Sequence, residues 1–187
     1  MDLTPTPSQT VGPYLHLGLT DTRSISRVAG ERVQGERVWV TFRVLDGEGQ
    51  PVRDAMVELW QADSVGNYAH QESSADDAAF RGFGRLATGE DGSCTFETIR
   101  PGCVPGPGEA VQAPHINVSI LGRGILKRLS TRLYFAGDPA NPADPVLALV
   151  PENRRVTLLA RPDPACAGRW NFDIRLRGRD ETVFFDV

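Results

Sequence analysis

The sequence predicts a mostly β protein, a sandwich or barrel of short strands with few short helices and long loops. Several segments alternate between apolar and polar residues, which is the period of a strand with one buried face. The chain also contains 19 glycines and 14 prolines, which suits many strands joined by tight turns. Its 187 residues are enough for one well-buried domain and too few for two.

The first clear strand pattern covers residues 38–45. Its apolar face would hold Val38, Val40, Phe42 and Val44. Side chains alternate across a strand, so these residues should point together into a core. Residues 46–51, which read Asp-Gly-Glu-Gly-Gln-Pro, should form the turn that ends the strand.

Further strands and a few helical turns are expected along the rest of the chain. The expected strands cover residues 55–61, 86–88, 94–96, 116–121, 129–135 and 170–176. Residues 86–88 and 94–96 should pair as a hairpin across the Asp91-Gly92 turn. Short helical turns are expected at residues 145–149 and 152–159.

The strand at residues 129–135 has two faces of different character. Leu129, Thr131, Leu133 and Phe135 would face the core. Arg132 and Tyr134 would then face outward, because they lie at the alternate positions.

The amino-terminal segment differs from the remainder. Residues 4–19 include Pro5, Pro7 and Pro13, so we expect neither a helix nor a central strand there. The segment could lie on the surface of its own domain or form an arm against a partner chain. We therefore expect one domain over residues 1–187, with an arm at 1–19 and a β-sandwich core at 20–187.

Composition excludes several classes of protein. The formal net charge of −4 argues against non-specific binding to nucleic acid or to an anionic membrane. Cys94, Cys103 and Cys166 are scattered, without the spacing of a zinc ribbon or disulfide framework. Free thiols fit a reducing cytoplasm. We expect a cytoplasmic protein without a signal peptide or a membrane span.

The run Gln-Ala-Pro-His-Ile-Asn at residues 112–117 is the most informative motif. His115 and Asn117 are two positions apart on an expected strand, so their side chains should share a face. Two histidines in this arrangement would suit one transition-metal ion. Asn117 supplies only a neutral amide, so half of a metal site is present.

Further segments extend this partial match over most of the chain. They cover residues 57–63, 66–70, 80–85, 99–102 and 114–116. Together they resemble the intradiol ring-cleaving dioxygenases, and the resemblance extends from Thr6 to Phe185. It implies a mixed β-sandwich of the intradiol dioxygenase type, in agreement with the strand pattern.

The resemblance also implies which residues occupy the family's metal-ligand positions. Catalytic chains of the family hold a non-haem ferric ion with two tyrosinates and two histidines. Tyr68 matches the first tyrosine and His115 the first histidine. Asn117 replaces the second histidine, and Val104, or its neighbour Cys103, replaces the second tyrosine. Because a ferric ion requires anionic oxygen donors, we expect no complete iron site in this chain.

Within the family, the chain resembles the alpha chains of members that contain two kinds of chain and act on protocatechuate. This implies an αβ heterodimer in which a homologous beta subunit binds Fe(III), with further assembly into a larger oligomer. The implied reaction is O2-dependent cleavage of protocatechuate between its hydroxyl-bearing carbons. Its product would be 3-carboxy-cis,cis-muconate, in aromatic catabolism.

The resemblance assigns two contributions to the beta subunit's active-site cleft. The first is the arm with Thr10, Gly12, Pro13 and Tyr14, where glycine permits close backbone approach and proline stiffens the turn. The second is Arg132, whose guanidinium suits the carboxylate of the aromatic substrate.

Plainer interpretations of the same residues remain open. Arg132 could lie on a solvated strand face, Tyr68 could pack at a strand end, and His115 could be a buried, hydrogen-bonded histidine. Gln112 falls near an arginine that family members place before the histidine pair.

Two other functions are also compatible with the sequence. One is a stand-alone metal dioxygenase in which His70, Asp63 or Cys103 replaces the missing ligands. The other is a non-catalytic β-sandwich module that binds a carbohydrate or a protein surface.

Overall fold

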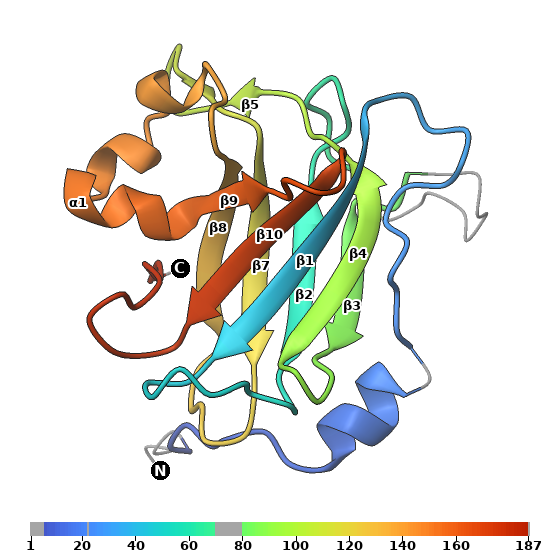
Figure 1. Ribbon diagram of the computed structural model, residues 1–187, viewed down its shortest axis with the longest axis vertical. Helices are drawn as coiled ribbons and strands as arrows, with labels where there is room; N and C mark the ends of the chain where they lie inside the picture. The colour runs from blue at the N-terminus through green and yellow to red at the C-terminus, as the bar shows by residue number, and fades with distance from the viewer. Residues whose placement is uncertain (1–5, 22, 70–79, 187) are drawn as a thin grey trace, which may run out of the picture.

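The computed structural model describes residues 6–21, 23–69 and 80–186, whose strands form two layers packed face to face (Figure 1). The front layer contains β1 (Arg37–Leu45), β4 (Ser93–Ile99) and β10 (Arg169–Arg175). The back layer contains β2 (Met56–Gln61), β3 (Phe83–Ala87), β7 (His115–Leu121) and β8 (Leu129–Phe135). Two further short strands, β5 (Val104–Pro105) and β6 (Val111–Gln112), pair with each other.

The strand β9 (Leu159–Pro162) connects the two layers. It runs parallel to β8 and antiparallel to β10, so the eight strands follow the order β3-β2-β7-β8-β9-β10-β1-β4. In the front layer β1 pairs with β10 in parallel and with β4 in antiparallel orientation. The predicted mostly β, mixed β-sandwich is therefore confirmed.

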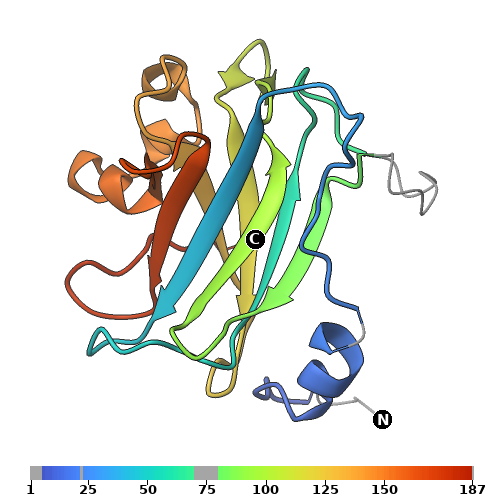
Figure 2. The same cartoon turned by 45° about the vertical axis from the view of Figure 1, so that its right-hand side comes forward.

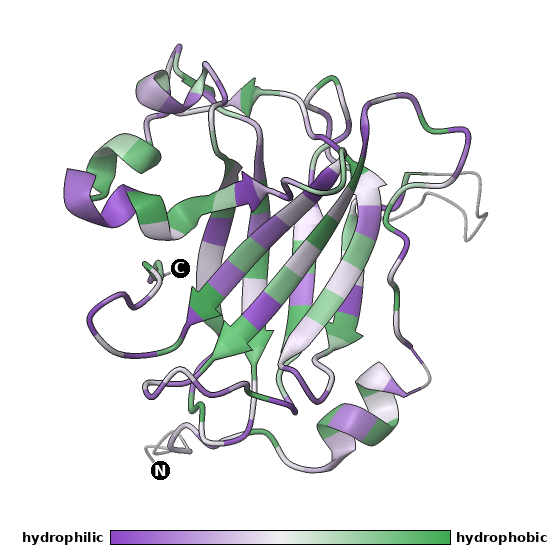
Figure 3. Cartoon of the chain, viewed as in Figure 1, coloured by the Kyte–Doolittle hydropathy of each residue, from purple (hydrophilic) through white to green (hydrophobic). Residues whose placement is uncertain are grey.

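The core lies between the layers and is filled by alternate residues of each strand. Val38, Val40, Phe42 and Val44 on β1 are fully buried, as the sequence predicts. The bands of alternating hydropathy along β1 and β10 are visible in Figure 3. Phe42 makes edge-to-face contacts with Phe96 and Phe172, at centroid distances of 5.6 and 5.9 Å. Burying each of these side chains contributes roughly 1.5–3 kcal/mol.

The prediction that residues 86–88 and 94–96 pair as a hairpin is wrong. β3 pairs with β2 and β4 pairs with β1, so the Asp91-Gly92 turn carries the chain from one layer to the other. The two strands face each other across the core at close range. A Cβ at Gly84 on β3 would lie only 2.8 Å from the Phe96 ring on β4. Facing each other across the core buries apolar side chains of both strands.

Short helices cover the outer side of β8, on the left in Figure 1. They are η2 (Asn141–Ala143), η3 (Leu147–Leu149), α1 (Glu152–Arg155) and η4 (Val156–Leu158). The last three lie within the helical turns predicted at residues 145–149 and 152–159, whereas η2 was not predicted. Tyr134 points away from the main core as expected, but it is not exposed, because this cap buries it with Leu147 and Leu158. None of the helices in the described residues is long and apolar enough to cross a membrane.

The arm is irregular from residue 6 to residue 12 and then becomes helical. The expectation that the whole segment lacks helix is wrong for η1 (His16–Thr20). Pro13 precedes this helix, at a position where proline is tolerated because its missing N–H would have no intrahelical partner. Figure 2 shows this helical segment below the sandwich, near the lower end of β3.

Candidate functional site

A row of four side chains crosses the outer face of the back layer. Phe83 on β3, Trp60 on β2, Asn117 on β7 and Arg132 on β8 are opposite one another in register. Their strand neighbours point the other way into the core, so this row faces outward, and Trp60 is 36% exposed. The sheet thus places Asn117 next to Arg132 on its outer face.

Tyr68 reaches this row from the loop that follows β2. Its ring stacks on Trp60 with a centroid distance of 6.1 Å and an interplanar angle of 3°. Its hydroxyl accepts a hydrogen bond from Nδ2 of Asn117 at 3.4 Å. The structure therefore brings together Tyr68 and Asn117, two positions that the family resemblance assigns to one metal.

The loop that carries Tyr68 packs tightly against the segment that contains Val104. Gly66 has a positive φ of 91°, and a Cβ there would collide with the carbonyl oxygen of Cys103. Val104 itself is buried on β5, with 4% of its surface exposed. A valine side chain has no donor atom, so the position that the resemblance gives to the second tyrosine is apolar here.

His115 keeps the features of a metal-binding histidine. It is 2% exposed, and its Nδ1 donates to the carbonyl oxygen of Ala113 at 2.8 Å. The proton is therefore on Nδ1, which leaves a lone pair on Nε2; within the described residues Nε2 has no hydrogen-bond partner. Burial, assisted by the charge of Arg132, lowers the pKa of His115 to about 4. The imidazole is neutral at pH 7 and could donate to a metal.

These residues do not fit a ferric ion. Tyr68 and His115 are the only two of the four ligand positions with a suitable donor. Among residues 6–21, 23–69 and 80–186, no cluster of three or more His, Cys, Asp or Glu side chains could hold a metal.

Of the substitute ligands considered from sequence, two lie in the described part of the chain, and neither is arranged to complete the site. Asp63 uses Oδ1 to accept hydrogen bonds from the backbone N–H groups of Val65 and Asn67, so it holds its own turn. Cys103 is exposed. His70 lies outside the described residues.

Arg132 is held by neutral partners. Its Nη1 donates to Oε1 of Gln112 at 2.7 Å and to the hydroxyl of Tyr134 at 3.4 Å. The Tyr134 hydroxyl donates in turn to Oδ1 of the fully buried Asp144 at 3.0 Å. Burial raises the pKa of Tyr134 to about 12, so the phenol remains protonated. Sequence reasoning missed this network, because Asp144 lies in the helical cap, and no local pattern indicates that it faces β8.

The arm is attached through Thr10. Its hydroxyl accepts a hydrogen bond from the Gly124 N–H at 2.7 Å and donates to the Gly122 carbonyl at 3.4 Å, in the turn between β7 and β8. Beyond this anchor, Tyr14 is 81% exposed. Arg132 lies in the middle of β8 rather than at this turn. Within one chain the anchor of the arm and Arg132 therefore occupy separate places.

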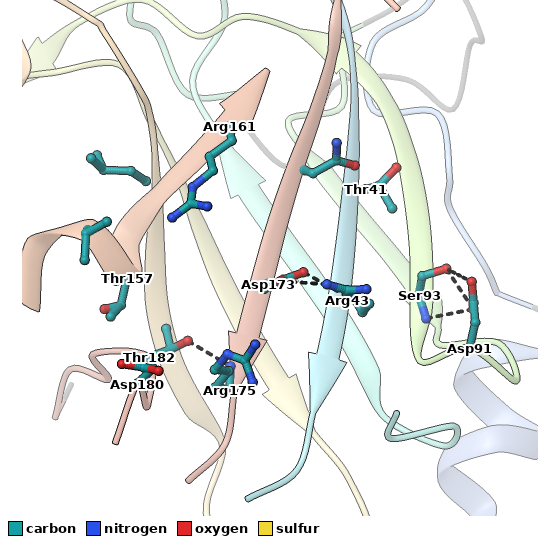
Figure 4. Close-up of a pocket in the computed structure, with 13 residues that line it drawn as sticks. Thr41, Arg43, Asp91, Ser93, Thr157, Arg161, Asp173, Arg175, Asp180 and Thr182 are labelled. Atoms are coloured by element: carbon teal, nitrogen blue, oxygen red, sulfur yellow. Dashed lines mark hydrogen bonds and ion pairs between the residues drawn. The ribbon is translucent and has the colours of Figure 1, made fainter. Parts of the chain in front are cut away.

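A polar depression of about 770 Å³ lies on the other layer and contains none of these candidate residues (Figure 4). Three of its charged side chains are engaged within the chain. Arg43 forms two hydrogen bonds with Asp173, at 2.9 and 2.8 Å, which raise the pKa of Arg43. Asp91 accepts hydrogen bonds from Ser93.

Comparison with known proteins gives the family. Residues 11–178 match the protein-family model described as Dioxygenase. The protocatechuate 3,4-dioxygenase alpha chain of Burkholderia cepacia is 44% identical over 97% of both chains. The chain belongs to the intradiol dioxygenase family.

Other intradiol dioxygenases are similar to this chain in sequence and in fold. The protocatechuate 3,4-dioxygenase beta chain of Burkholderia cepacia is 41% identical over 79% of this chain and 67% of its own length. A solved dioxygenase domain, from a dioxygenase carbohydrate-binding protein fusion of Streptomyces sp. SirexAA-E, has a TM-score of 0.63. The two sequences are 29% identical, and the match covers 94% of this chain and 100% of the solved domain.

Proposed function

We propose that this chain is the alpha subunit of a protocatechuate 3,4-dioxygenase. The assembled enzyme would cleave protocatechuate between its hydroxyl-bearing carbons to give 3-carboxy-cis,cis-muconate. One observation carries the proposal: at the family's ligand positions Asn117 bonds to Tyr68 and Val104 is apolar. An intradiol dioxygenase with such a site needs another chain for its metal chemistry.

The proposal places Fe(III) on a homologous beta subunit. Tyr68 and His115 offer one phenol and one neutral imidazole, which is too few donors for a ferric ion in competition with water. A relative of 41% identity that is named as a beta chain supports a pair of chains with a common fold. Such a pair can associate about a pseudo-twofold axis, as identical subunits do about a true one.

In this proposal the chain contributes the wall of the partner's cleft. Thr10 anchors the arm, and Gly12 and Pro13 lead to the exposed ring of Tyr14, which is free to contact another chain. Arg132 presents a positive charge on the outer face of the back layer. That charge suits the carboxylate of protocatechuate, because guanidinium and carboxylate match in geometry.

Association of the αβ pairs into a larger oligomer and a cytoplasmic location belong to the same proposal. The exposed apolar side chains of Tyr14 and Leu17, 81% and 59% accessible, support burial of the arm by a partner. The three cysteines are free, which fits a reducing compartment.

Co-expression tests the proposal. The chain would be purified with and without a candidate beta chain, and iron content, mass and cleavage of protocatechuate would be measured. We expect one iron per αβ pair and activity only in the complex. Iron and ring cleavage in the isolated chain would instead indicate a stand-alone enzyme. A stable monomer that does not bind the beta chain would indicate a non-catalytic β-sandwich binding module.

A further inference from the structure

We propose that Tyr134 and Gln112 are positioning residues for Arg132, and that they make the assembled enzyme selective for catechols that carry a carboxylate. This inference rests on the proposed function, in which Arg132 meets the substrate carboxylate. Tyr134 and Gln112 would act only through Arg132.

The geometry of the guanidinium is the first argument. Both hydrogen bonds from Arg132 to the described residues use Nη1, one to Gln112 and one to Tyr134. The edge formed by Nε and Nη2 makes no hydrogen bond within the described part of the chain. That edge provides two parallel N–H donors, which is the arrangement that binds a carboxylate through both oxygens.

Tyr134 is itself held by burial and by a further hydrogen bond. It is fully buried, and its hydroxyl proton is donated to Oδ1 of Asp144 at 3.0 Å. A phenol has one proton, so the oxygen can only accept from Arg132. Asp144 is fixed in turn, because it accepts hydrogen bonds from the backbone N–H groups of Ala113, Val146 and Leu147.

Gln112 is also oriented from its far side. Its Nε2 donates to the carbonyl oxygen of Pro105 at 2.8 Å, which turns Oε1 toward Arg132. Two acceptors, each held by a further hydrogen bond, fix one nitrogen of the guanidinium. Such pre-organisation lowers the entropy lost when a ligand binds.

The neutrality of both anchors is the second argument. Arg43, Arg85 and Arg100 each pair directly with a carboxylate of this chain. The partners of Arg132 among the described residues are instead an amide and a phenol, and Asp144 lies one hydroxyl away. The positive charge is therefore held in place without a direct ion pair to any described residue, and it remains available to an anionic substrate.

Two substitutions in the assembled αβ enzyme test this inference. Tyr134→Phe removes one acceptor and keeps the ring, and Gln112→Glu keeps the shape but adds a competing charge beside Arg132. For each variant, KM and kcat would be measured with protocatechuate and with the uncharged 4-methylcatechol. For Tyr134→Phe we expect the KM for protocatechuate to rise about fivefold, the equivalent of one net hydrogen bond, with little change in kcat. For Gln112→Glu we expect KM to rise at least as much, because the new carboxylate competes with the substrate carboxylate for Arg132. The KM for 4-methylcatechol should remain unchanged.

A double-mutant cycle with Arg132→Ala provides the control. In the Arg132→Ala background, Tyr134→Phe should have no further effect on the KM for protocatechuate. An additive effect, an equal rise in KM for both substrates, or an unchanged KM in folded variants would overturn the inference. Should Tyr134→Phe fail to assemble, Gln112→Glu, which alters a half-buried side chain, decides the question by the same criteria.

The cycle also separates this inference from the proposed function. If Arg132→Ala itself leaves the KM for protocatechuate unchanged, the assignment of Arg132 to the cleft is wrong. If Arg132→Ala raises KM but Tyr134→Phe and Gln112→Glu do not, only the positioning role is wrong.

Discussion

The amide nitrogen of Asn117 donates a hydrogen bond to the hydroxyl of Tyr68 at 3.4 Å. The family resemblance assigns these two positions to one metal, whereas here the two side chains are hydrogen-bonded to each other. The bond lets a polar pair persist on this face without a cation. The phenol oxygen of Tyr68 thus accepts from a neutral amide.

Tyr68→Phe should therefore be mild. The ring would still stack on Trp60, and the variant would lose one long hydrogen bond on a half-buried surface. We expect a loss of stability of about 1 kcal/mol or less and unchanged iron content in the αβ enzyme. Thermal melting and metal analysis are the measurements. Loss of iron from the complex would mean that Tyr68 is a ligand after all.

Arg132→Ala should weaken substrate binding much more than it weakens the fold. A charge-assisted hydrogen bond contributes about 1.5–3 kcal/mol, so the KM for protocatechuate should rise about 10- to 150-fold. Stability should change little, because Arg132 is bonded to neutral partners at a half-buried position. Steady-state kinetics and melting of the complex measure both effects.

Arg132→Lys is the matched control for charge without the planar fork. It should recover part of the lost affinity, because an ammonium keeps the attraction but cannot bind both carboxylate oxygens in the same geometry. Equal kinetics for the Ala variant and the unmodified enzyme would place Arg132 on a merely solvated strand face.

Local sequence patterns predicted the individual strands well. The buried face of β1 followed from alternation alone, because each strand must place its apolar side chains on one side. The same rule put His115 and Asn117 on one face of β7, and the structure agrees.

The predictions that failed depend on contacts between segments that are far apart in the sequence. Alternation cannot tell whether β3 and β4 pair edge to edge or face each other across a core, since both arrangements bury the same residues. The burial of Tyr134 depends on Leu147 and Leu158, which return over β8 after the strand has ended. Asp144, which fixes Tyr134, belongs to the same covering segment. Its role could not be inferred without the fold.

Thr10→Val should release the arm without affecting the sandwich. The substitution preserves shape but removes the hydroxyl that bonds to Gly122 and Gly124. We expect faster proteolysis of the isolated chain between residues 10 and 14, and a KM for protocatechuate raised about threefold to tenfold in the complex. Ser8→Ala, which removes an exposed hydroxyl from the same arm, is the control. Equal proteolysis of both variants would show that Thr10 is not the anchor.

His115 should make the stability of the isolated chain depend on pH. Its folded pKa of about 4 lies below the ordinary value of 6.5, because burial disfavours the imidazolium. Above pH 6.5 both folded and unfolded chains hold the neutral form, and the stability is complete. As the pH falls from 6.5 toward 4, His115 binds a proton in the unfolded chain but not in the folded chain, so the free energy of unfolding falls.

The size of this effect follows from the shift. One pKa unit corresponds to about 1.4 kcal/mol, so lowering the pH from 7.5 to 5 should cost about 2 kcal/mol through His115. His115→Gln removes the titrating group. Between pH 7.5 and pH 5, the free energy of unfolding in urea should therefore fall by about 2 kcal/mol less for the variant than for the unmodified chain. Carboxylates and the other histidines are common to both proteins, so the difference between the two pH profiles isolates His115. Parallel profiles would mean that the imidazole is accessible to protons in the folded chain, which its 2% exposure argues against.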